Sequence, residues 1–471
     1  MTTRHPIING NSTPGEAGLR DVIDPFHRNV IAQISYATKE QVSEAIASAH
    51  DVFRNNKLSV DQRSEILKNA SLMLADLSEE VARTITAESG KPITYSRIEV
   101  DRAVFTLKAS AEAAKTFHED LQIDVADAPG GKGKRVSVRY FPAGVLAAIT
   151  PFNFPLNLVM HKVAPAIACG CPVVLKPAPQ TPLTAFMLAD IFHQCNLPNG
   201  WLNVVPCEND VAESIVTDDR VKVLSFTGSA SVGWKLKSLV PKKKVTLELG
   251  GNGAVIVDNV DDWDSLIASL STSAFYYAGQ VCISLQRLFV KRELYDELLE
   301  RLITAAKMIP VGDPIREDVV VGPMISQAAS EKAWGWVESA IASGAIKHIG
   351  EYQKPNIITP TILTNVNPNC ELVCEEAFAP VVIVEPYDSF EGVIDRVNSS
   401  RYGLQVGVFT DDENKINLAY ERLEVGGVII NNTNTFRIDT VPYGGVKDSG
   451  FGREGVLWAM EEMCEPKVLV R

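Results

Sequence analysis

Three side chains in this sequence could together perform covalent chemistry at a carbonyl carbon: Asn153 in the string PFNFP, Glu248 in LELGG and Cys282 in GQVC. A cysteine thiolate is a strong nucleophile, a carboxamide donates a hydrogen bond to a developing oxyanion, and a carboxylate activates water as a general base. Taken singly, each residue has a plain structural alternative: a turn for Asn153, a helix or loop cap for Glu248 and a core thiol for Cys282. Together they suffice for covalent chemistry at a carbonyl.

The strands expected around these residues indicate how they come together. Short strands that are apolar on both faces alternate with helical segments, which is typical of a parallel sheet. Such sheets bind ligands at the carboxyl ends of their strands, and Asn153 and Glu248 follow the first and last strands of the set. The predicted strands are Val145–Thr150, Pro172–Leu175, Leu202–Val205, Val221–Phe226 and Val245–Leu249.

A second α/β unit is expected from about Gly253 onward. Helices near residues 295–306 and 328–342 alternate with strands near 379–384 and 427–430. The fold class is therefore α/β, with two units.

Helices are expected before the first sheet. Thr38 with Gln41, and Ser59 with Gln62, each form the capping-box pattern that marks a helix start.

Two glycine-rich strings look like phosphate-binding loops. The string GFGREG at 450–455 matches GxGxxG but lacks the βαβ unit and the later acidic residue of a dinucleotide fingerprint, so we do not assign it that role. The string GSASVG at 228–233 begins like a P-loop, yet Trp234 stands where the lysine should be, which argues against ATP. Its place between a strand and a helix suits either a pyrophosphate at the helix N-terminus or a plain strand-to-helix turn.

Composition argues against several other functions. The 471-residue chain has a net charge of −13 and a pI near 5.2, so its surface repels nucleic-acid backbones. The longest apolar run, about 143–149, is far shorter than the roughly 20 residues of a membrane helix, and the N-terminal string has no apolar leader core. The eight cysteines are sparse and lack zinc-ligand spacing, so we expect no metal site, no disulfide framework and a cytoplasmic location.

A series of motifs along almost the whole chain resembles the aldehyde dehydrogenase superfamily. The motifs follow the family's order: PFNFP at 151–155, LKPAPQTP at 175–182, FTGS at 226–229, LELGG at 247–251, GQVC at 279–282, EEAFAPV at 375–381 and PYGGVKDSGFGREG at 442–455. Within the family, the chain is most similar to the branch acting on small hydroxylated or acidic aldehydes, which includes lactaldehyde and non-phosphorylating glyceraldehyde-3-phosphate dehydrogenases. The resemblance implies NAD(P)+-dependent oxidation of such an aldehyde to its carboxylic acid.

The resemblance implies a role for each residue of the catalytic set. Cys282 attacks the aldehyde as a thiolate, while the Asn153 side chain and the Cys282 backbone N–H hold the oxyanion. Hydride leaves to the nicotinamide, and Glu248 activates the water that hydrolyses the resulting thioester. A relative that transfers the acyl group to coenzyme A is an alternative, although such relatives usually lack the base. A non-enzymatic structural protein on the same fold is a second alternative, which the intact set disfavours.

The resemblance also implies a binding site for NAD or NADP. Lys176 would contact the adenosine ribose, Gly228 and Ser229 the pyrophosphate, and Glu376 the nicotinamide ribose. NAD-preferring members usually have a glutamate three residues after the lysine, where this chain has Pro179. Without that carboxylate a 2′-phosphate is tolerated, so the choice of cofactor stays open. The implied cofactor residues are Ile149, Thr150, Pro151, Phe152, Lys176, Ala178, Pro179, Gly228, Ser229, Val232, Leu249, Glu376 and Phe378.

The substrate pocket is expected to be more apolar than that of phosphate-binding relatives. Those relatives often have an arginine where this chain has Val281, and Phe154 adds apolar surface, so we expect no strong phosphate clamp. We assign Arg437 to a carboxylate or hydroxyl group of the substrate, and the alternative is a salt bridge with Asp439 or another acid. The substrate-binding candidates are Phe154, Val281, Ile283 and Arg437, and the other cations considered are Arg102 and Arg287.

The expected architecture has three parts. These are a Rossmann-like, parallel-sheet cofactor domain (1–119 and 143–250), an α/β catalytic domain (251–455) and a small β oligomerisation element (120–142 and 456–471). The alternating strings KRVSVRYF and PKVLVR of the last element predict strands whose edges need a partner. We therefore expect a homodimer or a homotetramer.

Overall fold

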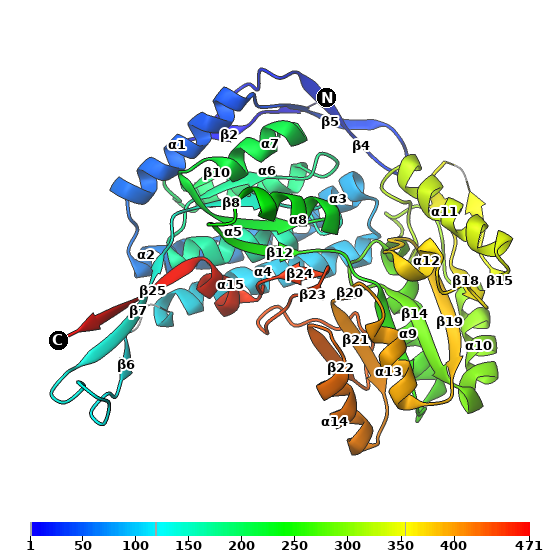
Figure 1. Ribbon diagram of the computed structural model, residues 1–471. Helices are drawn as coiled ribbons and strands as arrows, with labels where there is room; N and C mark the ends of the chain where they lie inside the picture. The colour runs from blue at the N-terminus through cyan, green and yellow to red at the C-terminus, as the bar shows by residue number, and fades with distance from the viewer. Residues whose placement is uncertain (1, 118–119, 354) are drawn as a thin grey trace.

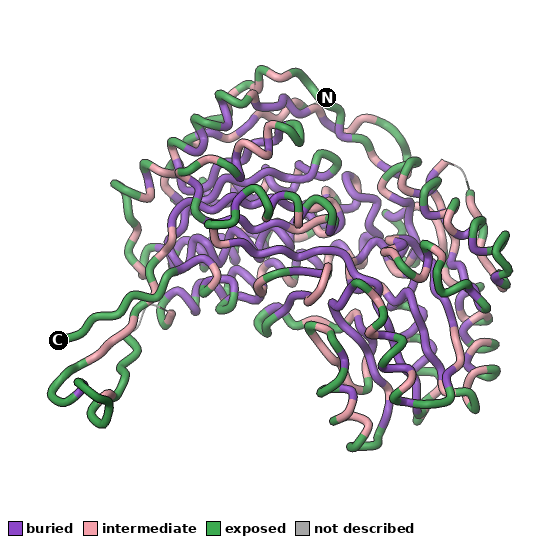
Figure 2. The backbone as a smooth tube through the Cα atoms, viewed as in Figure 1, coloured by how far each residue is buried: buried purple, intermediate pink, exposed green. Residues whose placement is uncertain are grey.

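The computed structural model describes residues 2–117, 120–353 and 355–471, and it has the α/β architecture that the sequence predicts. Two large, mainly parallel sheets form two lobes, and a thin three-stranded arm projects from the first lobe (Figure 1). Burial follows the two sheets, whereas most of the arm is exposed (Figure 2).

The first sheet has eight strands in the order β24-β12-β11-β8-β9-β10-β2-β3. Its five central strands are parallel, and each begins and ends within one residue of its predicted position. They are β8 (Val145–Ile149), β9 (Val173–Lys176), β10 (Leu202–Val204), β11 (Val221–Thr227) and β12 (Lys244–Glu248). Antiparallel strands flank them at both edges: β24 (Gly450–Phe451), β2 (Ile7–Ile8) and β3 (Asn11–Ser12).

Helices cover both faces of this sheet because its strands are apolar on both sides. Leu146 packs into a core shared with α2 to α6, whereas its neighbour Val145 faces a second core with α1, α7 and α8. Both predicted capping boxes are present, at Thr38 and Ser59. The helices are α1 (Lys39–Asn55), α2 (Val60–Asp76), α3 (Ser78–Ser89), α4 (Ile93–Thr116), α5 (Asn157–Cys169), α6 (Leu183–Gln194), α7 (Asn209–Thr217) and α8 (Ala230–Leu239).

The second sheet has seven strands in the order β15-β18-β19-β14-β13-β21-β22, of which only β15 is antiparallel. The strands are β13 (Gly253–Val257), β14 (Leu285–Lys291), β15 (Ile346–Ile349), β18 (Thr361–Thr364), β19 (Val381–Tyr387), β21 (Gln405–Phe409) and β22 (Gly427–Ile430). Its helices are α9 (Trp263–Phe275), α10 (Arg292–Lys307), α11 (Gln327–Ala342), α13 (Phe390–Asn398) and α14 (Glu413–Arg422).

The arm consists of β6 (Leu121–Ile123), β7 (Val136–Pro142) and β25 (Cys464–Val470). β25 lies antiparallel to β7 along its whole length, and β6 lies on the other edge of β7.

The predicted domain limits remain a proposal. The helix α15 (Val456–Glu462) packs into the first lobe, and β24 lies at the edge of its sheet, so we propose that both belong to the cofactor domain.

The remaining elements are short. They are β1 (Thr2–Arg4), β4 (Leu19–Ile23), β5 (Val30–Ser35), the 3-10 helix η1 (Tyr276–Gly279), β16 (Tyr352–Gln353), β17 (Ile357–Ile358), α12 (Glu371–Cys374), β20 (Tyr402–Gly403) and β23 (Val446–Lys447). Across the described ranges, every helix is too short or too polar to cross a membrane.

Candidate active site

A cavity of about 650 Å³ lies where the carboxyl ends of the first sheet face the second lobe. The parallel register sets Ile149 opposite Lys176 and Thr227 opposite Glu248, so these strand ends meet at one edge. Asn153, Glu248 and Cys282 line the cavity, together with every cofactor residue predicted from the sequence. The structure therefore brings the catalytic and cofactor sets to one site.

The turn before Cys282 has an unusual backbone. Tyr277, Ala278 and Gly279 have positive φ angles of 52°, 53° and 64°. A residue with a side chain in this left-handed region costs on the order of 1–3 kcal/mol unless its surroundings enforce it. Buried Tyr277 is anchored here, since its hydroxyl donates to the carbonyl of Ser89 at 3.3 Å. The surrounding core thus fixes the direction in which the nucleophile leaves the turn.

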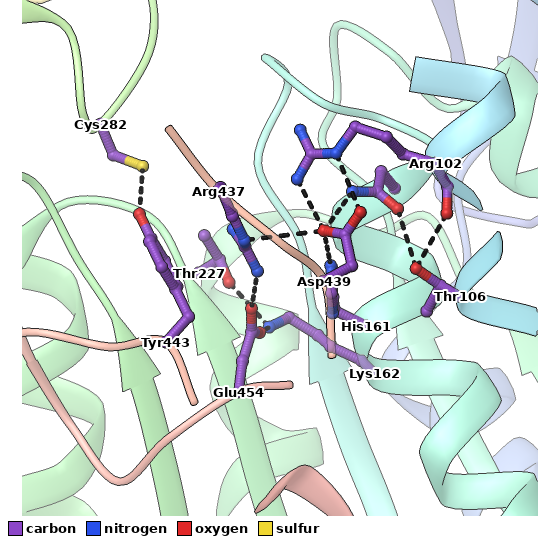
Figure 3. Close-up of polar contacts among 11 residues, drawn as sticks. Arg102, Thr106, His161, Lys162, Thr227, Cys282, Arg437, Asp439, Tyr443 and Glu454 are labelled. Atoms are coloured by element: carbon purple, nitrogen blue, oxygen red, sulfur yellow. Dashed lines mark hydrogen bonds and ion pairs between the residues drawn. The ribbon is translucent and has the colours of Figure 1, made fainter. Parts of the chain in front are cut away.

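The Cys282 thiol lies 3.3 Å from the hydroxyl of Tyr443 (Figure 3). Burial raises the pKa of the thiol to about 11, although the Tyr443 hydrogen bond and the charge of Arg437 lower it. The unliganded cysteine is therefore mostly a thiol at neutral pH, and forming the thiolate requires a base or a further positive charge.

Asn153 joins the two loops of the site. Its Nδ2 donates a 3.0 Å hydrogen bond to the carbonyl of Gln280, two residues before Cys282. A carboxamide has two N–H donors, so one remains for an oxyanion. The loop after Glu248 also approaches Cys282 closely. The glycine pair of LELGG allows this, because a Cβ at Gly251 would lie 2.6 Å from the carbonyl oxygen of Cys282.

Glu248 is buried, and neither of its carboxylate oxygens has a hydrogen-bond partner among the described residues. Burial and the nearby Glu454 carboxylate raise its pKa well above the usual range, although Arg437 and Lys162 oppose the shift. A carboxylate with a raised pKa is a stronger base than an exposed glutamate, which suits a general base.

A chain of charged side chains, drawn in Figure 3, acts electrostatically on Glu248. Lys162 Nζ donates to Thr227 Oγ1 and to Glu454 Oε1, both at 2.7 Å. Arg437 Nη2 lies 3.5 Å from the other oxygen of Glu454. Burial alone would raise the pKa of Glu454, but Lys162, His161 and Arg437 lower it to about 2.

The chain continues to Asp439. Arg102 donates to both carboxylate oxygens, at 2.9 and 2.6 Å, and His161 Nε2 lies 2.9 Å from Oδ1. Burial alone would raise the pKa of Asp439, but these hydrogen bonds hold it well below its usual range. Burial and Arg437 lower the pKa of His161, which therefore adds no charge at neutral pH. Among the described residues, three cations, including Lys162, thus form ion pairs with two carboxylates, and Lys162 and Arg437 also act on the Glu248 carboxyl.

The end of the cavity that the sequence analysis assigns to the adenosine contains a buried cation. Lys176 Nζ donates to Asn209 Oδ1 at 3.2 Å, and among the described residues it forms no ion pair. Burial lowers the pKa of this ammonium group. Pro179 also lines this cavity, together with Ser229 at the N-terminus of α8. A buried ammonium with only an amide partner suits the hydroxyl or phosphate oxygens of a nucleotide, so the site fits either cofactor.

The end of the cavity expected to take the nicotinamide contains Glu376, whose Oε1 accepts a 3.0 Å hydrogen bond from the N–H of Gly251. A Cβ at Gly250 would lie 2.4 Å from this carboxylate, so a side chain at position 250 would displace Glu376 from its present position. Burial raises the pKa of Glu376 to about 7. The rings of Phe152 and Phe378 meet edge to face, 5.8 Å apart.

The four substrate candidates do not line this cavity. Phe154 packs under the ammonium of Lys91, which lies 3.6 Å from its ring centroid. Val281 is buried in a small aromatic core, and Ile283 borders a minor cavity on another side of the nucleophile. Arg437 lines a separate small cavity and forms the ion pairs that we considered as its alternative. Their roles in substrate binding stay predictions.

Sequence reasoning missed Tyr443, Lys162 and Glu454. Tyr443 and Glu454 belong to the motif at 442–455. Only tertiary pairing brings that motif to the site of Glu248 and Cys282, since β24 places Gly450 opposite Glu248. Lys162 had a readable signal, because it is the single lysine in the mostly apolar helix α5, every residue of which is buried. A buried lysine requires a partner, and that partner is 292 positions away in the sequence.

Sequence comparison identifies the class of protein. The chain matches the aldehyde dehydrogenase family over residues 13–469. It is 41% identical over 451 residues to the 3-sulfolactaldehyde dehydrogenase of Priestia aryabhattai, with 96% of this chain and 94% of that protein covered. The chain belongs to the aldehyde dehydrogenase family.

Two solved structures support the same conclusion. Aldehyde dehydrogenase 21 from Physcomitrella patens, in complex with its reaction product succinate, is 40% identical with a TM-score of 0.97, covering 100% of this chain and 98% of that one. The glyceraldehyde-3-phosphate dehydrogenase GapN from Methanocaldococcus jannaschii, complexed with NADP, is 38% identical with a TM-score of 0.91, covering 96% and 98%. The family and branch predicted from the motifs are confirmed, and the protein is an NAD(P)-dependent aldehyde dehydrogenase.

Proposed function

We propose that this enzyme oxidises a small aldehyde bearing a carboxylate or sulfonate group to the corresponding acid. Cys282 is the nucleophile, Asn153 the oxyanion donor and Glu248 the general base. The observation that supports these roles is that the three side chains and the full predicted cofactor set line one cavity.

In the first half-reaction the Cys282 thiolate adds to the aldehyde carbon. The carbonyl oxygen becomes an oxyanion, which the Asn153 side chain and the Cys282 backbone N–H stabilise. The Tyr443 hydroxyl, 3.3 Å from the sulfur, donates to the thiolate before attack. NAD(P)+, when bound, supplies the hydride acceptor, and loss of hydride from the adduct leaves a thioester on Cys282.

In the second half-reaction Glu248 takes a proton from water, and the resulting hydroxide adds to the thioester carbon. The C–S bond then breaks, which releases the carboxylic acid and restores the Cys282 thiolate. Because neither oxygen of Glu248 has a partner among the described residues, its carboxylate is available to orient that water. Hydrolysis by this base, rather than transfer to coenzyme A, is the outcome that the residue set favours.

For the cofactor we propose that Lys176 and Asn209 hold the adenosine ribose, the N-terminus of α8 the pyrophosphate and Glu376 the nicotinamide ribose. The buried ammonium of Lys176 suits both the hydroxyls of NAD and the 2′-phosphate of NADP.

The cations beside the site favour a substrate with an anionic group. Among the described residues, Arg102, Lys162 and Arg437 form ion pairs with two carboxylates, those of Asp439 and Glu454, and the Arg102 side chain is still 26% exposed. A substrate anion near Arg102 would give this partly exposed guanidinium a further counter-charge. Relatives named for 3-sulfolactaldehyde, or solved with succinate, are consistent with a small anionic substrate.

A panel of aldehydes matched in length tests the proposal. Aldehydes with a carboxylate, a sulfonate, a hydroxyl or a methyl terminus are assayed at 340 nm with NAD+ and NADP+, with and without coenzyme A. We expect kcat/KM for the anionic members to exceed the methyl member by at least tenfold, or ~1.4 kcal/mol. A preference for the methyl member would contradict the proposed substrate, and coenzyme A dependence would favour acyl transfer instead.

We also propose that the arm mediates a homodimer or homotetramer. Leu121, Val468 and Val470 on the arm are 64%, 59% and 56% exposed, and apolar strands of this kind need a covering partner. Light scattering that detects only a 51.3 kDa particle would contradict this proposal.

The free thiols of all eight cysteines are consistent with a reducing, cytoplasmic location.

A further inference from the structure

The strand β14 contains a β-bulge at Gln286, four residues after the nucleophile. Leu285 and Arg287 pair with two consecutive residues of β13, so Gln286 is the extra residue between them. The packing shows the same break, because the buried side chains of Leu285 and Leu288 belong to one core although they are three positions apart. In a regular strand Gln286 would share that face with Leu288. Bulges redirect a side chain and are common beside active sites.

The redirected side chain of Gln286 holds the segment 371–378 at three points. Its Nε2 donates to the carbonyl oxygens of Leu372 and Glu375 at 2.7 and 2.8 Å, and its Oε1 accepts from the N–H of Ala377 at 3.0 Å. Gln286 is 5% exposed, so these hydrogen bonds are shielded from water. The amide thus uses both of its N–H donors and its oxygen on this one segment.

Glu376 lies between two of these contacts. Gln286 holds the carbonyl group before Glu376 and the N–H group after it. The Glu376 carboxylate itself accepts from the N–H of Gly251 at 3.0 Å. The Gln286 side chain therefore fixes the main chain from which this carboxylate extends, and Gly251 fixes the carboxylate.

Asn252 supports the same segment from the loop after Glu248. It follows directly after Gly251, and its Nδ2 donates to the carbonyl oxygens of Val373 and Glu375 at 2.7 and 3.2 Å. A carbonyl oxygen has two lone pairs, so the Glu375 carbonyl can accept from both buried amides at once. One amide lies on the strand that follows the nucleophile, and the other lies on the loop that follows the base.

We propose that Gln286, assisted by Asn252, is a positioning residue for the cofactor, because it fixes the main chain of Glu376 and with it the place of the nicotinamide ribose. This inference rests on the proposed role of Glu376 toward that ribose. Since Cys282 and Gln286 lie on one short segment, β14 sets the spacing between the sulfur and the ribose carboxylate. Hydride transfer depends on such spacing, and a misplacement of about 1 Å can cost ~10²-fold in rate.

Isothermal titration calorimetry of the full-length enzyme tests the proposal without turnover. NAD+ is compared with ADP, or NADP+ with 2′,5′-ADP, according to which dinucleotide the wild type binds more tightly. The shorter nucleotides lack the nicotinamide ribose. In Gln286→Met we expect the Kd of the dinucleotide to rise by about tenfold or more, or ~1.4 kcal/mol, while the Kd of the shorter nucleotide stays within about twofold. Equal weakening of both nucleotides, or of neither, overturns the proposal.

The variant Glu376→Ala separates this inference from the proposed function. It should weaken the dinucleotide and leave the shorter nucleotide unchanged. If Glu376→Ala leaves the Kd of the dinucleotide unchanged, the proposed role of Glu376 is wrong, and the inference fails with it. If Glu376→Ala weakens the dinucleotide and Gln286→Met does not, only the positioning role of Gln286 is wrong.

The matched control is Asn398→Leu. Asn398 Nδ2 donates to the carbonyl oxygen of Arg422 at 2.7 Å, and its Oδ1 accepts from the N–H of Glu424 at 2.9 Å. This amide also joins two main-chain groups, but none of the three residues lines the active-site cavity. We expect Asn398→Leu to lower the thermal unfolding midpoint and to leave the Kd of the dinucleotide unchanged. A rise in that Kd as large as in Gln286→Met overturns the proposal.

A second variant covers the case in which Gln286→Met does not fold. Asn252→Leu removes the hydrogen bonds to the carbonyl groups of Val373 and Glu375 and keeps those of Gln286. It should also weaken the dinucleotide more than the shorter nucleotide. If the two Kd values rise equally, or if neither rises, the proposal is overturned.

Discussion

The hydroxyl of Tyr443 lies 3.3 Å from the sulfur of Cys282, and the guanidinium of Arg437 lies 3.7 Å from the centroid of the same ring. Tyr443 therefore connects the nucleophile to the buried charges around Glu454 and Asp439. Because these residues follow one another in the C-terminal segment 437–454, the loop that closes the site also sets the electrostatic environment of the thiol.

The first prediction concerns Tyr443→Phe. The Tyr443 hydrogen bond lowers the pKa of Cys282 against the larger effect of burial, so its removal should raise that pKa further. A hydrogen bond to a charged group contributes ~1.5–3 kcal/mol, and ~1.4 kcal/mol is one pKa unit, so the shift should be about one to two units. The pH dependence of Cys282 alkylation by iodoacetamide measures it. The control is Tyr420→Phe, at a tyrosine that is 76% exposed, and equal pH profiles for both variants would contradict the role of Tyr443.

The second prediction concerns Glu248→Gln. The amide cannot take a proton from water, so the first turnover should still produce a burst of NAD(P)H, while steady-state turnover falls by ~10²–10⁴-fold. In the wild type, deacylation should increase with pH as Glu248 loses its proton, and the midpoint should lie well above the usual range because burial raises this pKa. Stopped-flow absorbance separates the two phases. Unchanged steady-state turnover would assign the base elsewhere.

The third prediction concerns Glu454→Gln. After burial, the Glu454 carboxylate is the main cause of the raised pKa of Glu248, so its removal should lower that pKa. Glu248 would then be deprotonated at lower pH, and the acid limb of the kcat profile should move toward lower pH. The matched control is Glu461→Gln, at an exposed glutamate in the nearby helix α15. An acid limb that moves toward higher pH, or does not move, would argue against the coupling.

The fourth prediction concerns stability. Lys91 and Glu99 form an ion pair in which both side chains are fully buried, and Glu99 also accepts from the N–H groups of Leu156 and Asn157 at 2.9 and 3.0 Å. Lys91→Met leaves the Glu99 carboxylate buried without a counterion, so the free energy of unfolding should fall by ~3–5 kcal/mol. Urea unfolding measures it, with Lys108→Met on the exposed face of α4 as the control. A loss no larger than that of the control would show that water or another group compensates the charge.

The sequence was sufficient to predict the strand ends and, through them, much of the site. Apolar strands can be recognised from a short stretch of sequence. Because parallel strands bind ligands at their carboxyl ends, Asn153 and Glu248 are expected at one edge of the sheet without any knowledge of contacts. Charge pairing is not local. We assigned Arg437 to the substrate, with a salt bridge to Asp439 or another acid as the alternative, and the structure pairs it with Asp439 and with the distant Glu454. The partners of a buried charge depend on tertiary packing, which periodicity and motif spacing do not encode.

The last prediction concerns cofactor choice and the variant Pro179→Glu. Pro179 lines the cavity together with Lys176, whose buried ammonium has only Asn209 as a hydrogen-bond partner. A carboxylate at position 179 would pair with that ammonium and repel a 2′-phosphate, so kcat/KM for NADP relative to NAD should fall by at least tenfold, or ~1.4 kcal/mol. Initial rates with both cofactors at saturating aldehyde measure the ratio. Gln180→Glu adds the same charge one residue away at an exposed position of the same cavity, and it should change the ratio much less. If the two variants shift the ratio equally, the effect is one of general charge, and Pro179 does not face the 2′ position of the ribose.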